Sequence, residues 1–202
     1  HRKQVLEPEA ENNLKNKIIK HKAITDTISS KVREQYEQNP YPRWMSLHLF
    51  PSPISISEFV NRANLKIPNR SILEIKAPRV LQAGCGTGQH SIELASTFKD
   101  CNVLAVDLSL SSLAYAKRKT EELNIQNIQY MQADILHLDK LNKNFDLIEC
   151  GGVLHHMEDP ILGWKKLIDI LSESGLMKIG LYSKIARKEL CNFRKKIDLK
   201  TD

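Results

Sequence analysis

From Pro78 onward the chain alternates short apolar, β-branched runs with longer segments of helical periodicity. This alternation is typical of parallel strands joined by crossover helices, because each connection must travel back along the sheet. It predicts an α/β fold with a doubly wound parallel sheet. The predicted strands cover residues 79–84, 101–108, 127–134, 145–152 and 176–183, and the predicted helices cover 90–98, 109–124 and 160–172. A polar connection follows residue 134, and Gly175 is expected to end the last helix.

The first 77 residues have a different character and are predicted to form a helical extension of the main domain, residues 78–202. Ile24, Ile28, Val32 and Tyr36 are spaced four apart, which places them on one face of a helix over 25–37. The following segment, residues 39–53, contains four prolines and is predicted to be an ordered loop. A second short helix is expected at 57–63, and residues 67–78 are expected to be a linker.

Composition limits the class of protein. A chain of 202 residues suits one main core, and no apolar run approaches the roughly 18 residues of a membrane span. The four cysteines stand far apart without a CxxC pair, which argues against a zinc site or disulfide framework and suits the cytoplasm. Because the first residue is His1 rather than Met, we expect the numbering to begin inside a longer chain.

The net charge of +6 is concentrated near the end of the sequence. Residues 175–202 contain eight Lys and Arg residues against three Asp and Glu residues. Such a tail could bind a phosphate backbone, but the solvated face of a terminal helix is the favoured interpretation. Nucleic acid is therefore a possible partner that is not favoured.

A glycine-rich turn, GCGTG over residues 84–88, follows the first predicted strand directly and precedes a helix. Glycines allow a tight turn and let backbone N–H groups approach a ligand at the positive end of the helix. The dinucleotide fingerprint requires glycine at position 89, where this chain has Gln89, which disfavours a nicotinamide oxidoreductase. Packing of a helix on a strand is the alternative explanation of the turn.

Two acids end the next two strands. Asp107 follows Val106 and Asp134 follows Ala133, so both lie at the edge of the sheet that holds the glycine turn. A carboxylate in the position of Asp107 can accept both hydroxyls of a ribose, and Asp134 suits an adenine amino group. Either acid alone is more often a helix cap or a solvated turn residue, but the ordered set favours a nucleoside site.

Here the sequence resembles the class I S-adenosylmethionine-dependent methyltransferases. The residues that carry this resemblance are VLQAGCGTG (80–88), VLAVDLS (103–109), QAD (132–134) and FDLIECGGVLHHMEDP (145–160). A narrower resemblance, carried by QYEQNPYPRW (35–44), GTGQH and LMKIGLYSKIARKE, is to the methyltransferase module of bacterial proteins that also contain tetratricopeptide repeats. The resemblance to class I methyltransferases implies a Rossmann-like sheet. We expect this sheet to be truncated after strand five in the present chain, because the family's last antiparallel hairpin is missing.

The resemblance also implies a cofactor, S-adenosylmethionine, and positions that bind it. Its methionine part would lie against the glycine turn, its ribose on Asp107, its adenine near Asp134, and its sulfonium beside the end of the fourth strand. Gln82 stands where the family usually has an acid for the cofactor's amino group. The implied residues are Gln82, Gly84, Cys85, Gly86, Gly88, Asp107, Leu108, Asp134, Ile135, Cys150 and Gly151.

Aromatic residues of the proline-rich segment offer a possible lid. Tyr36, Tyr41, Arg43 and Trp44 could close over the cofactor, with the arginine facing its carboxylate, or could instead pack the first helix against the sheet. The sequence leaves these two interpretations evenly balanced. We include Tyr36, Arg43 and Trp44 among the candidate cofactor residues.

The acceptor of the methyl group is not readable from the sequence. His155 and His156 follow the fourth strand, where one could act as a base, although turn residues are the favoured interpretation. No metal is predicted, because adjacent histidines on a helix point in different directions. The expected function is methyl transfer to a protein or small molecule, and the alternative is a catalytically idle cofactor-binding or regulatory module. Oligomeric state is open.

Overall fold

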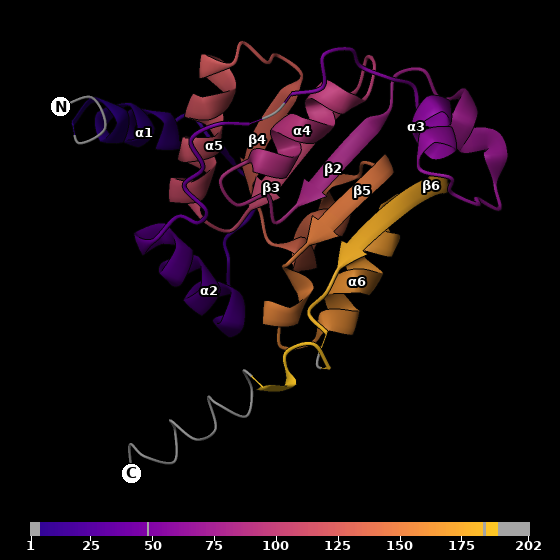
Figure 1. Cartoon of the computed structure of the whole chain (residues 1–202). Helices are drawn as coiled ribbons and strands as arrows, with labels where there is room; N and C mark the ends of the chain where they lie inside the picture. The colour runs from indigo at the N-terminus through magenta and orange to yellow at the C-terminus, as the bar shows by residue number, and fades with distance from the viewer. Residues whose placement is uncertain (1–4, 48, 184, 190–202) are drawn as a thin grey trace.

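A computed structural model of the chain describes residues 5–47, 49–183 and 185–189. Six parallel strands of these residues form one sheet with the order β1-β4-β3-β2-β5-β6 (Figure 1). The chain runs outward from β2 to β4 and then returns to the other side of β2, so the predicted doubly wound sheet is confirmed. The strands are β1 (Ile19–Lys20), β2 (Arg79–Ala83), β3 (Asn102–Asp107), β4 (Ile128–Gln132), β5 (Phe145–Gly151) and β6 (Leu171–Gly180).

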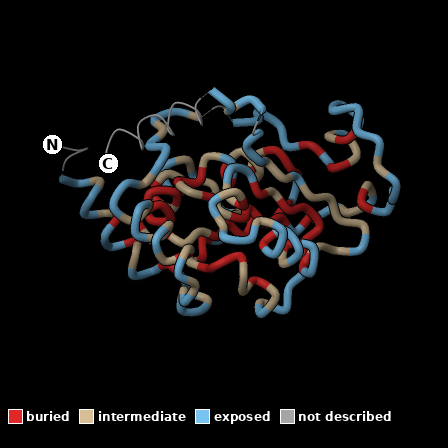
Figure 2. Tube along the Cα trace, turned by 90° about the horizontal axis from the view of Figure 1, so that it is seen from below, coloured by how far each residue is buried: buried red, intermediate tan, exposed pale blue. Residues whose placement is uncertain are grey.

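Helices cover both faces of the sheet. Alternate side chains of β2 show why, since Val80 packs toward α3 and α4, whereas Leu81 packs toward α6. The first face carries α1 (Glu7–Lys15), α3 (Ile56–Arg62), α4 (Gln89–Thr97) and α5 (Leu110–Glu122), and the second carries η3 (Ile135–Leu141), η4 (Leu154–His156) and α6 (Pro160–Ile168). Figure 2 shows buried residues along the central segments and exposed ones around the periphery.

Two N-terminal elements were not predicted. Helix α1 packs on α5, and β1 adds a sixth strand beside β4, with Ile19 paired to Met131. Helix α1 is polar, and its docking depends on the buried Glu11, which pairs with the buried guanidinium of Arg118 at 3.0 Å. A partner more than 100 residues away in sequence leaves no local pattern, so this helix could not be predicted from local sequence.

The predicted end of the last helix was wrong. Helix α6 ends at Ile168, strand β6 begins at Leu171, and Gly175 lies inside that strand. Between β5 and β6 the register shifts, since Phe145 pairs with Leu171 but Leu147 pairs with Leu176. The apolar run therefore continues as an irregular strand instead of a helix, and the glycine accommodates the irregularity because a Cβ there would lie 2.7 Å from a methyl of Leu171.

Other segments agree more closely with expectation. The predicted helix over 25–37 is α2 (Thr27–Gln38), and that over 57–63 is α3. The expected linker contains a short turn of helix, η2 (Arg70–Glu74), and the expected polar connection forms η3, which buries Ile135 and Leu138. None of the helices in the described ranges has the length and apolar character needed to cross a bilayer. The basic tail from residue 190 lies outside the described residues.

A buried carboxylate ties three strands together at their amino ends. Asp146 of β5 accepts hydrogen bonds from the backbone N–H of Arg79 at 2.9 Å, from its guanidinium at 3.0 and 3.2 Å, and from the hydroxyl of Ser172 at 2.9 Å. Burial alone would raise the pKa of Asp146, but the hydrogen bonds from Arg79 lower it overall. This contact lies at the edge of the sheet opposite the strands' carboxyl ends.

We predict that Asp146→Asn lowers the free energy of unfolding by about 2 kcal/mol near pH 7, because charge-assisted hydrogen bonds are lost. The native pKa is depressed, so the wild-type advantage is complete above the ordinary Asp pKa and disappears as pH falls through the native value. Urea denaturation of both proteins across this pH range measures the difference. Equal stability near pH 7, or an advantage that grows in acid, would contradict the assignment.

Candidate functional site

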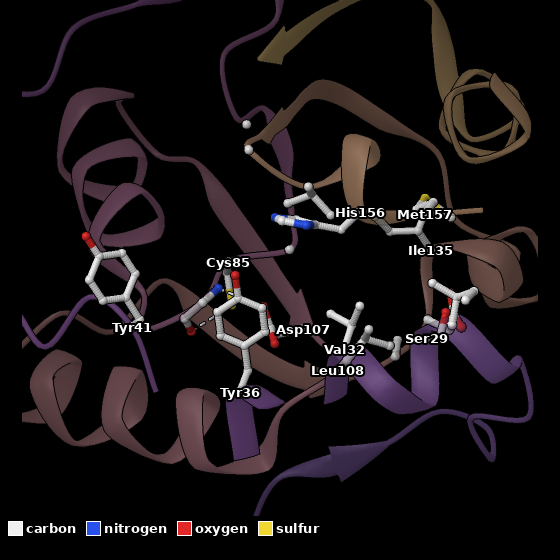
Figure 3. Close-up of a pocket in the computed structure, with 18 of the residues that line it drawn as sticks. Ser29, Val32, Tyr36, Tyr41, Cys85, Asp107, Leu108, Ile135, His156 and Met157 are labelled. Atoms are coloured by element: carbon white, nitrogen blue, oxygen red, sulfur yellow. Dashed lines mark hydrogen bonds between the residues drawn. The ribbon is translucent and has the colours of Figure 1, made fainter. Parts of the chain in front are cut away.

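A cavity of about 310 Å³ opens at the carboxyl ends of the strands, beneath α2 (Figure 3). It lies where the chain reverses direction across the sheet, which is the usual ligand position in open α/β sheets. Nine of the fourteen residues singled out from the sequence line it. They are Tyr36, Gly84, Cys85, Gly86, Asp107, Leu108, Asp134, Ile135 and Gly151.

The other five residues lie outside the lining of this cavity. Gln82 is buried in β2 with 2% exposure, and its side-chain carbonyl has no hydrogen-bond partner among the described residues. Cys150 is fully buried, and Gly88 supports the packing of α4 on α5, because a Cβ there would lie 2.5 Å from that of Ala116. Arg43 and Trp44 anchor the proline-rich segment, as described below.

The glycine turn is built by backbone contacts. The N–H groups of Gly84 and Cys85 both donate to the carbonyl of Val106 at 2.9 Å, which fixes the turn to the end of β3. Gly86 has φ +52° and presents its N–H to the carboxylate of Asp107 at 2.8 Å. A residue with a side chain is strained at this φ, so glycine here is a conformational requirement as well as a means of ligand approach.

Asp107 connects this turn to the next helix. One carboxylate oxygen accepts from Gly86, and the other accepts from the N–H of Ser109 at 2.9 Å, at the start of α5. Burial raises the pKa of Asp107, and these two hydrogen bonds act in the opposite direction. Each carboxylate oxygen keeps a free acceptor direction that hydroxyl donors could use.

Asp134 offers an unused acceptor to the cavity. Its side chain is 4% exposed, and one oxygen accepts from the N–H of Leu136 at 3.0 Å, which caps η3. The other oxygen is buried and has no hydrogen-bond partner within the described structure. A buried carboxylate oxygen without a partner raises the free energy of the folded protein. A ligand that donates a hydrogen bond to this oxygen would therefore bind more tightly.

Helix α2 forms the roof of the cavity. The side of the helix predicted from its four-residue spacing faces the site, and Ile28, Val32 and Tyr36 all line it. Glu37 holds the end of this helix over the fold, because it accepts from the hydroxyl of Ser109 at 2.9 Å and from the N–H of Ser111 at 3.0 Å. Partial burial acts to raise the pKa of Glu37, but these hydrogen bonds lower it overall.

The proline-rich segment both lines the cavity and is fixed from behind. Tyr41 and Pro42 face the cavity, whereas the indole N–H of Trp44 donates to the carbonyl of Thr87 at 3.0 Å, beside the glycine turn. The hydroxyl of Tyr115 on α5 donates to the carbonyl of Trp44. Arg43 pairs with Glu11 of α1 at 3.2 Å. Tyr41 and Pro42 therefore cover the cavity, whereas Arg43 and Trp44 pack the segment against the rest of the protein.

Two histidines and a tyrosine stand together at one side of the cavity. The ring of His155 lies between those of His156 and Tyr182, with centroids 4.3 and 3.8 Å away and ring planes tilted by 49° and 33°. The guanidinium carbon of Arg187 lies 3.7 Å from the centre of the Tyr182 ring. His156 and Tyr182 line the cavity. Burial and then the Arg187 charge lower the pKa of His156. Of these residues, only His155 and His156 were identified from the sequence. The lining also includes Ser29, His90, Ala133, Gly152, Val153 and Met157.

The cysteine thiols near the site are not poised as nucleophiles. Burial raises the pKa of Cys85 well above its ordinary value, and it raises that of Cys150 to about 12. Both thiols therefore remain protonated at neutral pH and behave as small apolar groups. Covalent catalysis through cysteine is disfavoured by these surroundings.

Comparison with known proteins finds similarity to methyltransferases. Residues 80–175 match a family model described as a methyltransferase domain. An uncharacterized protein of Synechococcus sp. is 34% identical over 127 residues, which are 62% of this chain and 30% of that protein. The tRNA (guanine-N(7)-)-methyltransferase of Rubrobacter xylanophilus is 36% identical over 98 residues, which are 47% of this chain and 43% of that enzyme.

Among solved structures, PKMT2 from Rickettsia typhi in complex with AdoHcy is similar over 68% of this chain and 26% of that protein, with 25% identity and a TM-score of 0.51. The chain thus spans less than half the length of each of these three proteins. The fold of the described residues is the Rossmann-like fold of class I methyltransferases. S-Adenosylmethionine is the cofactor that the matched domain family and the AdoHcy-bound neighbour indicate.

Gly151 provides a direct probe of the cavity. A Cβ added at this glycine would meet no atom within 4 Å, and its φ lies outside the left-handed region. We predict that Gly151→Val changes stability by no more than about 0.5 kcal/mol but weakens binding of S-adenosylhomocysteine at least about tenfold by filling ligand space. Calorimetric titration measures the affinity, and Gly151→Ala should give a smaller loss. Unchanged affinity in the valine variant would place the ligand elsewhere.

Proposed function

We propose that this chain binds S-adenosylmethionine in the cavity at the strand ends and transfers its methyl group to a nucleophilic acceptor. The observation that carries the proposal is Asp134, which lines the same cavity as the glycine turn and Asp107 and keeps one buried carboxylate oxygen without a partner among the described residues. An acceptor for an amino group, acceptors for hydroxyls and a glycine-rich turn that allows close backbone approach are the features that an adenosine with an amino-acid tail requires.

Each part of the cofactor has candidate residues in this chain. We assign its ribose hydroxyls to Asp107 and its adenine amino group to Asp134, with Leu108 and Ile135 as the apolar neighbours of the base. The amino-acid part would lie against Gly84 and its following turn, and the sulfonium near Gly151. Gln82, Gly88 and Cys150 would act from behind the lining, by supporting the walls that these residues form.

The chemistry asked of the protein is positioning. Bound S-adenosylmethionine supplies an activated methyl group, and the chain has to hold an acceptor in line with it. Effective molarities of oriented reactants correspond to about 7 to 11 kcal/mol of barrier lowering, so an orienting cavity covered by α2 is sufficient for most of the rate. Ile28 and Val32 would exclude water from the reacting groups on the α2 side.

We further propose that α2 and the proline-rich segment act as the cover of this site. Tyr36 and Tyr41 face the cavity, while Arg43 and Trp44 would hold the cover in place through Glu11 and Thr87. In this assignment Arg43 and Trp44 are positioning residues and do not contact the cofactor. The narrower resemblance to repeat-containing bacterial methyltransferases remains part of the proposal.

The acceptor and the setting are also proposals. One relative is named as a tRNA methyltransferase, and we propose a protein or small molecule as the acceptor of this chain. Three cysteines are free, buried thiols, which supports a reducing compartment such as the cytoplasm. The fourth, Cys191, lies outside the described residues.

We predict that Asp107→Asn weakens S-adenosylhomocysteine binding by about 1 to 3 kcal/mol, because hydroxyl hydrogen bonds to a charged acceptor are replaced by weaker ones. Asp100→Asn is a matched control, since Asp100 is exposed, lies outside the cavity and has a left-handed φ that asparagine tolerates well. Calorimetry on both variants gives the comparison. Equal affinities in the two variants would show that Asp107 does not hold the ribose.

Methyl transfer itself is tested with S-adenosylmethionine labelled in the methyl group. The purified chain is incubated with it and with fractionated bacterial extract, and the label is followed by mass spectrometry into protein, RNA and small-molecule fractions. The proposal predicts labelled product that the Gly151→Val variant forms more slowly. Tight cofactor binding without any labelled product would overturn the transferase assignment and favour the idle cofactor-binding module.

A further inference from the structure

The lining of the cavity is chemically divided. Its two carboxylates, Asp107 and Asp134, come from the strand ends, and no other carboxylate is found among its described lining residues. A second group of lining residues comes from η4 and the segment after β6. This group, called here the aromatic side, consists of His156 and Tyr182. If the cofactor occupies the carboxylate side, as the proposed function requires, the aromatic side is left for the acceptor.

The charge beside the aromatic side is positive. The guanidinium carbon of Arg187 lies 3.7 Å from the centre of the Tyr182 ring, and its charge acts on both His155 and His156. An acceptor that arrives as an ammonium ion would be repelled by Arg187 and by the sulfonium of the cofactor. No lining carboxylate on the aromatic side would offset this repulsion. An acceptor whose oxygen develops negative charge would be stabilised by both positive groups.

His156 is placed to take a proton from such an acceptor. Figure 3 shows its ring extending from η4 into the cavity, whereas Tyr36 stands beside Asp107. The neighbouring ring of His155, 4.3 Å away and itself packed on Tyr182, holds this orientation. Because burial and Arg187 lower the pKa of His156, its imidazole is neutral and able to accept a proton at neutral pH.

We propose that the aromatic side binds an apolar molecule that carries a weakly acidic hydroxyl on an unsaturated carbon, a phenol or an enol, and that His156 accepts its proton during methyl transfer. The oxygen's electron pair forms the new bond to the methyl carbon as the carbon–sulfur bond breaks, and the electron pair of that bond stays on sulfur. The hydroxyl proton moves to a ring nitrogen of His156 and is released to water afterwards. Charge is therefore balanced without any further reactant.

Binding tests the acceptor class separately from catalysis. Protein saturated with S-adenosylhomocysteine is titrated calorimetrically with 4-ethylphenol and, in parallel, with phenethylamine, which has a similar size and carries an ammonium group. We expect 4-ethylphenol to bind at least about tenfold more tightly. Equal binding, tighter binding of the amine, or no binding of the phenol while S-adenosylhomocysteine binds would overturn the inference. Failure of S-adenosylhomocysteine to bind would overturn the proposed function itself.

Catalysis tests the role of His156. With S-adenosylmethionine present, His156→Gln should slow formation of 4-ethylanisole about 100-fold, a usual contribution of general base catalysis, and should leave S-adenosylhomocysteine affinity unchanged. The loss should be much smaller with 4-nitrophenol, which ionises readily and needs no base. A merely structural role would slow both acceptors equally, and that result would contradict the assignment. His137→Gln, outside the cavity lining, is the control and should leave both rates unchanged.

Discussion

The carboxylate of Asp107 is the contact on which the site depends. It accepts one backbone N–H from Gly86 in the turn after β2 and another from Ser109 at the start of α5, so it fixes two strand-to-helix connections relative to each other. Ser109 in turn donates to Glu37, which places the roof helix α2 over the same point. The glycine turn, the start of α5 and the end of α2 are therefore all connected to Asp107, directly or through Ser109. A carboxylate that already organises backbone donors is preorganised for hydroxyl donors of a ligand, because little rearrangement is needed.

The amino ends of the strands contribute to the stability of the fold. There Asp146 joins β2, β5 and β6 through Arg79 and Ser172 and supports the fold without contributing to the cavity. This separation of stability and function between the two ends of parallel strands is common in α/β proteins. It explains why the cavity edge can contain glycines in left-handed conformations while the strands themselves remain well packed. It also means that changes at the two edges should be separable by experiment.

Much of this arrangement could be predicted from local sequence. Asp107, Asp134 and the glycine turn each end a strand, and parallel topology brings strand ends together, so their meeting follows from the alternation of elements alone. The helical spacing of Ile28, Val32 and Tyr36 likewise anticipated one face of α2. The rest depends on contacts between distant residues. Helix α1 docks through Glu11 and Arg118, and the contact of His155 with Tyr182 brings together residues separated by α6 and β6. The end of the last helix was predicted wrongly at Gly175, because glycine is typical both of helix ends and of irregular strands.

The most direct test of the central claim is a crystal structure of the chain with S-adenosylhomocysteine. The account predicts ligand density in the cavity beneath α2, with the ribose hydroxyls on Asp107, the adenine amino group within hydrogen-bond distance of the free oxygen of Asp134, and the sulfur beside Gly151. Density elsewhere, or an adenosine turned so that Asp107 and Asp134 contact other parts of it, would contradict the assignment of this site.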